Sequence, residues 1–159
     1  MVDIERVGVK NILTPLKLLR DKGMKVTNLR LQVLELFLEK QEPLSHAAVF
    51  EHLAVLGRQP NRVTLYRVLS AFSDAQIVHE VQGMNGPVRF CLHKPFPDGC
   101  PGNHPHFLCQ ECGRMFCLRE QLLPYVEVPE GSLVEGKQLL IFGLCPQCSQ
   151  QTRKNAVVL

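Results

Sequence analysis

The first half of the chain carries apolar residues at the three- and four-residue spacing of amphipathic helices. Three such segments, at 14–23, 27–38 and 45–56, each begin with a Thr or Ser that can cap the first helical turn. A fourth segment follows Pro60-Asn61, and its apolar face is formed by Leu65, Val68, Leu69 and Phe72. Four helices are therefore expected before the pattern changes.

After the fourth segment the apolar spacing shortens to every second residue, as in β-strands. Residues 77–81 and 87–92 are typical of two strands, joined by a turn at 82–86 that contains Gly and Asn. Helices followed by such a hairpin predict a winged helix-turn-helix. In that fold the last helix before the wing enters the major groove of DNA.

The second half predicts a smaller unit of mixed structure. Short apolar runs at 106–108, 114–118 and 138–142 are typical of strands, and a short helix is a candidate at 119–125. Residues 93–103 are rich in Pro and Gly, which favours a hinge. We therefore expect an α+β protein with a winged-helix DNA-binding domain at 1–92, a hinge at 93–103 and an α/β domain at 104–159.

Composition narrows the class of protein. The 159 residues are 45% hydrophobic, which is too apolar for a disordered chain and sufficient for a globular one. The first residues lack a basic start followed by an apolar run, and no stretch approaches the roughly 20 apolar residues of a membrane span. A cytoplasmic protein without a membrane partner is therefore expected.

The charge distribution is more informative than the total. A formal charge of +3 is too small to identify a nucleic-acid binder. Between His52 and Asp74, however, the charged residues are all arginines, namely Arg58, Arg62 and Arg67. They form either a DNA-binding surface or an ordinary solvated helix face.

Two C-x-x-C pairs, Cys109/Cys112 and Cys145/Cys148, carry the strongest chemical signal. Each turn places two sulfurs along one edge of a tetrahedron, so two turns complete the four-thiolate shell of a structural zinc site. The odd total of seven cysteines and the expected reducing compartment disfavour a disulfide set. A redox-active C-x-x-C would need a βαβ context that the sequence lacks. We expect one structural zinc here.

A second group of nitrogen and sulfur donors surrounds the expected hinge. It comprises His79, Cys91, His93, His104 and His106. The wing strands would bring the first two together, and the i, i+2 spacing of the last two puts both imidazoles on one side of an extended segment. A single histidine is more often a surface residue, but this set predicts a second metal site. Its donors favour zinc, although imidazole also accepts iron, nickel and copper.

The remaining cysteines are weaker candidates. Cys117 lies in an apolar run and is either a small core residue or an extra ligand. Cys100 lies in the expected hinge and is either an auxiliary ligand or a residue without a role in metal binding.

Nearly all of residues 14–148 take part in a resemblance that four motifs carry: TNLR at 27–30, VTLYRVL at 63–69, HPHFLCQECG at 104–113 and FGLCPQC at 142–148. Together they resemble the ferric uptake regulator (Fur) superfamily of bacterial metal-dependent repressors. The cysteine at the end of the wing resembles the zinc uptake regulator (Zur) branch. That resemblance implies a homodimer held by the C-terminal domain and a palindromic, A/T-rich operator. It also implies that a regulatory zinc is held by His79, Cys91, His104 and His106, with His93 and Cys117 as candidate extra ligands.

The expected function is that of a zinc-responsive repressor of zinc uptake genes, with one structural and one regulatory zinc per subunit. Zinc at the second site would fix the angle between the domains so that both recognition helices of the dimer meet operator DNA. The expected DNA-contacting residues are Tyr66 and Arg67, followed by Thr64 and Arg62. Arg58 is a candidate for phosphate contact.

Three alternatives remain at this stage. A relative in the same superfamily would sense iron, manganese, nickel or peroxide. A zinc-dependent or thiol-dependent enzyme would need an open coordination position and a general base, for which the sequence offers no set, and no small-molecule substrate is expected. A zinc-ribbon interaction module would not need the basic helix and the wing.

Overall fold

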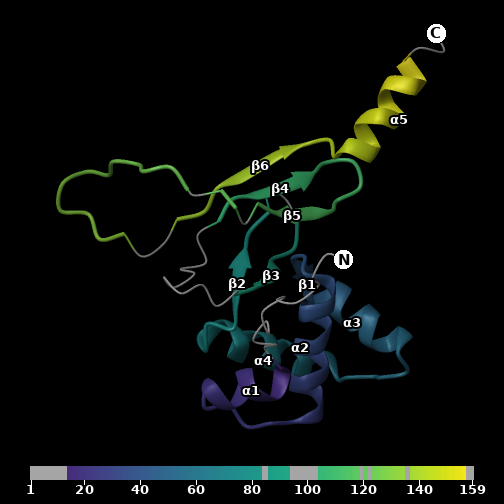
Figure 1. The fold of residues 1–159 in the computed structure, drawn as a ribbon, viewed down its shortest axis with the longest axis vertical. Coiled ribbons are helices and arrows are strands. Elements are labelled where there is room, and N and C mark those ends of the chain that lie inside the picture. The colour runs from purple at the N-terminus through teal and green to yellow at the C-terminus, as the bar shows by residue number, and fades with distance from the viewer. Residues whose placement is uncertain are drawn as a thin grey trace, which may run out of the picture.

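The computed structural model describes residues 14–83, 86–93, 104–118, 120–121, 123–134 and 137–156. Figure 1 shows a helical N-terminal half and a C-terminal half built on a small sheet, with strands β2 and β3 running between them. The expected α+β class is confirmed. None of the described helices is both long and apolar enough to cross a membrane.

Four helices form the N-terminal half, as expected. They are α1 (Pro15–Asp21), α2 (Asn28–Lys40), α3 (His46–Val55) and α4 (Arg62–Asp74). Each begins after a residue whose side-chain oxygen accepts a hydrogen bond from a backbone N–H of the first turn, which satisfies a donor that the helix itself leaves unpaired. The caps are Thr14, Thr27, Ser45 and Asn61.

The apolar faces of these helices form the main core of the molecule. Its largest fully buried side chains are Leu19, Leu34, Phe37, Leu53, Leu65, Leu69 and Phe72. Burying a side chain of this size contributes roughly 1.5–3 kcal/mol, so the apolar stripe of α4 is firmly fixed inward. The opposite face of α4 is therefore left in solvent.

The wing is a three-stranded antiparallel sheet in the order β1-β3-β2. It consists of β1 (Leu44–Ser45), β2 (Val78–Val81) and β3 (Arg89–Leu92), of which the last two are the predicted hairpin. The strand β1 was not predicted, because two residues carry no alternating pattern. In this sheet His79 lies directly opposite Cys91.

The C-terminal half is a sheet in the order β5-β4-β6 followed by a helix. Its elements are β4 (His106–Cys109), β5 (Met115–Cys117), β6 (Leu140–Gly143) and α5 (Pro146–Ala156). β4 and β6 are parallel, which requires a long connection. The chain between β5 and β6 supplies it and loops away from the body (Figure 1). The candidate helix at 119–125 is wrong for the residues described there, because proline at 124 lacks a donor and disfavours the preceding helical turn.

The two halves contact each other through side chains of the wing. Val81 and Cys91 pack against Met115 in a small apolar cluster that also takes in Leu108, Cys117 and Leu140. Beside it, the backbone N–H of Gln82 donates to Oε1 of Gln138 at 3.2 Å, and Nε2 of Gln138 donates back to the carbonyl of Gln82 at 2.7 Å. These hydrogen bonds fix β2 against the segment that enters β6.

A second set of contacts holds β3 and the end of α2 against the turn between β4 and β5. Nη2 of Arg89 donates to the carbonyl oxygen of Gly113 at 2.8 Å. Arg114, the next residue, forms an ion pair with Glu42 at 3.6 Å. None of these residues was singled out by the sequence, because nothing in their local pattern points to a partner so distant along the chain.

Candidate functional site

The four cysteines of the C-x-x-C pairs come together at one end of the β5-β4-β6 sheet. Cys109 ends β4, and Cys112 lies in the turn that follows. Gly113 closes that turn at φ +70°, a left-handed conformation that favours glycine. The second pair lies at the start of α5. Three elements that are close in space thus deliver the four sulfurs.

The geometry of this four-cysteine group fits a tetrahedral metal. Its four Sγ atoms lie within 4.8 Å of one another. The Sγ atoms of Cys112 and Cys145 are 3.9 Å apart, close to the separation of about 3.8 Å expected for two sulfurs that are each about 2.3 Å from one zinc. The backbone N–H of Cys145 also donates to Sγ of Cys109 at 3.3 Å, a bond that stabilises a thiolate.

Two thiols of this group, Cys109 and Cys148, have pKa values shifted in opposite directions. Backbone N–H groups of Cys112 and Cys145 lower the pKa of Cys109 to about 6, so this thiol ionises readily at neutral pH. Hydrogen bonding with the Cys145 thiol and burial raise the pKa of Cys148 to about 12. Four sulfurs at this distance cannot all carry negative charge without a cation among them, so the donor set fits a dication such as zinc.

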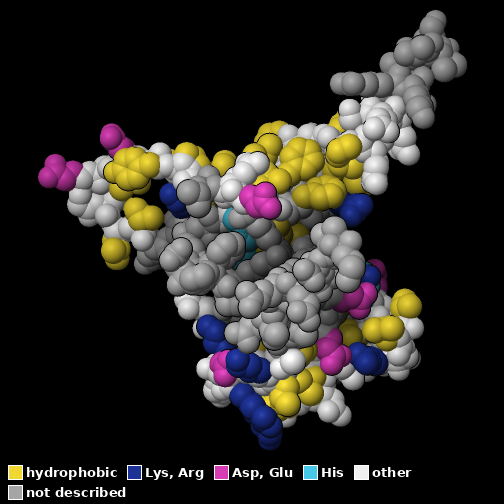
Figure 2. Space-filling model, viewed as in Figure 1, with side chains coloured by type: hydrophobic (Ala, Val, Ile, Leu, Met, Phe, Trp, Pro, Cys, Tyr) yellow, Lys and Arg dark blue, Asp and Glu magenta, His cyan; other side chains and the backbone are white. Residues whose placement is uncertain are grey.

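The second group gathers its donors from both halves. His79 and Cys91 come from opposite positions of β2 and β3, while His104 and His106 precede and begin β4. Their four ligand atoms also lie within 4.8 Å of one another, and Sγ of Cys91 is 3.8 Å from Nε2 of His104. Figure 2 shows histidine side chains in the recess between the helical half and the sheet.

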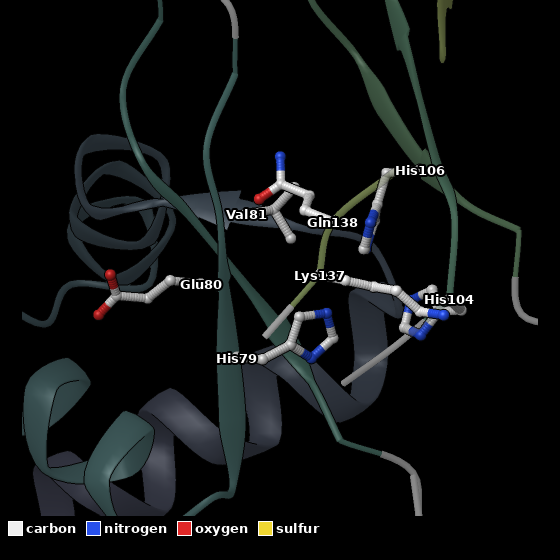
Figure 3. A pocket seen from close by; sticks show the side chains of 7 residues that line it. All are labelled: His79, Glu80, Val81, His104, His106, Lys137 and Gln138. Carbon is white, nitrogen blue, oxygen red and sulfur yellow. The ribbon is translucent and has the colours of Figure 1, made fainter. Parts of the chain in front are cut away.

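The imidazoles of this group face a shared cavity of about 320 Å³. In Figure 3 the rings of His79, His104 and His106 point toward a common centre, while Glu80 on the same strand as His79 points away from it. The ring centroids are 5.1 Å apart for His79 and His104 and 4.5 Å apart for His104 and His106. No ring in this set lies face to face with its neighbour.

Two of these imidazoles lack the hydrogen bonds that buried polar groups need. Both ring nitrogens of His79 and both of His106 are buried with no hydrogen-bond partner among the described residues. Leaving such a nitrogen unpaired costs roughly 1–3 kcal/mol. Burial, followed by the neighbouring imidazoles, lowers the pKa of His79 to about 3, so its ring is neutral at pH 7. Unpaired ring nitrogens that face a cavity are suited to metal coordination.

The two candidate extra ligands both lie beside this group. The ring of His93 is 4.9 Å from that of His79, edge to face. Cys117 lies opposite His106 in the β4–β5 pair, and its Sγ is 3.0 Å from Sγ of Cys91. Hydrogen bonding with that thiol lowers the pKa of Cys117 well below its usual range, against the effect of burial. Cys100 lies outside the described residues.

The expected DNA-contacting residues lie on or just before the solvent face of α4. Thr64, Tyr66 and Arg67 are exposed, Tyr66 by 60%. The Arg62 guanidinium lies 4.3 Å from the centroid of the Phe50 ring of α3, which holds this side chain against the body. Arg58, before the helix, forms an ion pair with Glu35 of α2 at 4.0 Å. The ring of Tyr66 lies beside that of His46, with centroids 6.3 Å apart. Thr64 and Arg67 extend into solvent without such an anchor among the described side chains.

Comparison with known proteins identifies the family. Residues 21–127 match the model of the ferric uptake regulator family. The chain belongs to this family. It is 30% identical over 142 residues to the ferric uptake regulation protein of Neisseria gonorrhoeae, covering 86% of this chain and 94% of that protein. Fur-family proteins are metal-responsive transcriptional regulators, not enzymes, and they bind operator DNA as dimers.

Solved structures agree on the fold. The Vibrio cholerae ferric uptake regulator is 25% identical, with a TM-score of 0.59 over 80% of this chain and 96% of that one. A zinc uptake regulator in complex with zinc and DNA is 21% identical, with a TM-score of 0.59 over 87% of this chain and 92% of that one. Family membership excludes the enzyme alternative. It leaves open the choice among the metals that Fur-family regulators sense.

Proposed function

We propose that this chain is a zinc-responsive repressor of the zinc uptake regulator type, acting in the cytoplasm on genes for zinc uptake. In this proposal His79, Cys91, His104 and His106 hold the regulatory zinc. The observation that carries it is the pair of buried imidazoles, His79 and His106, whose ring nitrogens are unpartnered and face a cavity. A metal at this point would relieve the cost of burying them.

The donor chemistry favours zinc over the harder cations. The group of four contains three imidazoles and one thiol and no carboxylate. Manganese is better served by oxygen donors, whereas zinc binds thiolate and imidazole in a tetrahedron. When bound, zinc would supply a fixed tetrahedral centre that joins donors of the two halves.

The placement of the donors suggests how occupancy controls DNA binding. His79 and Cys91 belong to the wing that follows α4, whereas His104 and His106 belong to the half expected to dimerise. Engagement of all four donors draws β2 and β3 onto β4 and so sets the angle of α4. Because a metal that binds this arrangement more tightly also stabilises it, operator DNA must tighten metal binding by the same factor. The hinge at 93–103 is described only at His93.

The dimer surface is proposed to include β6. Ile141, Phe142 and Leu144 are exposed by 41%, 50% and 41%, and all three are large apolar residues. Figure 2 shows hydrophobic side chains gathered on this half of the molecule. The four-cysteine group, one zinc in this proposal, would then brace the dimerisation half without taking part in sensing.

DNA contact is assigned to Tyr66, Arg67, Thr64 and Arg62, with Arg58 on phosphate. If Arg67 reads a base, Arg67→Ala should cost about 1–3 kcal/mol of operator affinity and relax sequence preference at one position. Arg58→Ala should weaken all DNA sequences alike and lower the salt dependence of binding by about one counterion. Binding curves on operator and scrambled DNA at several salt concentrations separate the two roles.

The second candidate is a Fur-family regulator of another metal, and the name of the Neisseria relative, a ferric uptake regulation protein, favours iron. Metal analysis before and after mild chelation, coupled to operator binding with zinc, iron or manganese, distinguishes the two. We expect one zinc that resists chelation and one that exchanges, with zinc restoring operator binding at the lowest free concentration. Restoration by iron alone would refute the zinc assignment.

A further inference from the structure

Cys117 is the described thiol that belongs to neither four-membered donor group. Its Sγ nevertheless lies 3.0 Å from Sγ of Cys91, the one sulfur of the histidine group. The two residues come from different halves of the molecule, Cys91 from β3 and Cys117 from β5. They pack in the small apolar cluster through which the wing contacts the C-terminal sheet.

The separation of these sulfurs differs from that of two sulfurs on one metal. In the four-cysteine group, Cys112 and Cys145 are 3.9 Å apart, close to the edge of about 3.8 Å of a zinc tetrahedron. The Cys91–Cys117 pair is shorter, at 3.0 Å. It needs to close by only about 1 Å to reach the disulfide bond length of about 2.0 Å. The geometry therefore places the two sulfurs within reach of a disulfide bond.

Exposure distinguishes the roles of the two thiols. Cys91 is fully buried, whereas Cys117 is partly exposed. A small oxidant from solvent would thus reach Cys117 first. A partly exposed cysteine with a second thiol next to it is the usual arrangement of a reversible redox site.

We propose that Cys91 and Cys117 form a reversible disulfide when the protein meets a peroxide, and that this bond blocks loading of the regulatory site. Hydrogen peroxide oxidises the Cys117 thiol to a sulfenic acid, and its O–O bond breaks with release of one water. Sγ of Cys91 then attacks Sγ of Cys117, and the hydroxyl leaves with the Cys91 thiol proton as a second water. Two thiols are oxidised and one peroxide is reduced.

The consequence for metal binding rests on the proposed function. A sulfur in a disulfide is no longer a thiolate ligand, so oxidation leaves His79, His104 and His106 as the remaining donors. Conversely, a metal bound to Sγ of Cys91 would prevent this sulfur from attacking Sγ of Cys117. The protein would then respond both to zinc and to peroxide, through one shared cysteine.

The test uses the full-length chain carrying Cys100→Ser, with its tightly held zinc retained and the exchangeable metal removed. One equivalent of hydrogen peroxide should produce a Cys91–Cys117 cross-link, seen by peptide mass spectrometry as a loss of two hydrogens and reversed by a thiol reductant. The affinity of the oxidised protein for added zinc should fall by at least about 10-fold. Zinc added beforehand should slow cross-linking.

Cys117→Ser is the matched variant, because it removes the partner thiol and keeps all four proposed ligands. It should form no cross-link, bind exchangeable zinc as the parent does and keep that affinity after peroxide treatment. Absence of the cross-link in the parent overturns the inference and leaves the zinc-sensor proposal standing. A cross-link that leaves zinc affinity unchanged overturns the coupling between the two. Loss of zinc affinity in unoxidised Cys117→Ser would make Cys117 a ligand and overturn its assignment as a redox partner.

Discussion

The two donor groups of this protein are built in opposite ways. The four-cysteine group lies within the C-terminal half, where a glycine-closed turn and the start of α5 present the sulfurs. The histidine group takes two donors from the wing and two from the C-terminal half. The first can therefore form when one half folds, whereas the second requires the two halves to meet.

Because of this difference, we expect the two groups to have different roles. Binding energy at the four-cysteine group is folding energy of the C-terminal half, because no preformed site exists in the unfolded chain. Binding energy at the histidine group is shared with the arrangement of the halves, so it can bias that arrangement. The following changes test that contrast, beginning with the largest expected effect.

Cys148→Ser should remove the zinc proposed for the four-cysteine group and unfold the C-terminal half. Apparent zinc-binding free energies of about 10–16 kcal/mol in small structural sites match or exceed the stability of a whole domain, about 5–15 kcal/mol. The variant should lose the dimer and the thermal transition of this half, as measured by metal content, gel filtration and circular dichroism. Cys117→Ser is the control, since it removes a thiol of the same half that lies beside the histidine group instead. If Cys148→Ser stayed folded and dimeric with full zinc content, the four-cysteine group would not be required for folding of the C-terminal half.

Cys91→Ser should leave the fold and the zinc proposed for the four-cysteine group intact, and affect only the exchangeable site proposed at the histidine group. Loss of an outer-shell partner already costs about 10- to 100-fold in metal affinity, so loss of a ligand should cost at least about 100-fold. Competition titration with a zinc chelator measures the affinity, and operator binding at fixed free zinc measures the consequence. If zinc-dependent operator binding persisted unchanged in Cys91→Ser, the sensing assignment would be lost.

The sequence predicted the parts of the molecule that depend on neighbours in the chain. The four helices followed from their caps and apolar spacing, and the four-cysteine group followed from its two short motifs. The meeting of His79 with Cys91 was also expected, because a hairpin register pairs them. In each case a local rule fixes which side chains lie together.

Most of the missed contacts lie between the halves. The position of Cys117 beside Cys91 follows from how β5 packs against β3, which no spacing within either strand reveals. The hydrogen bonds between Gln82 and Gln138 span 56 positions and involve exposed, polar residues with no pattern of their own. α5 was missed because it is strongly polar and carries no apolar periodicity. Packing between the halves decides the first two, whereas α5 was missed because of its own polar sequence.

Gln138→Ala should have the smallest effect, and it sharpens the contrast most directly. It removes both hydrogen bonds to the backbone of Gln82 without touching a proposed ligand. Because these bonds are exposed, we expect a loss of about 1 kcal/mol, which is about fivefold in affinity. That loss should fall on the exchangeable zinc alone, since only this site depends on how the halves meet. Gln121→Ala, at an exposed position of the same half, is the matched control. If Gln138→Ala weakened zinc binding equally at both groups, the C-terminal half itself would have been disturbed. If it weakened binding at the histidine group alone, the affinity of that group would depend on the contacts between the halves.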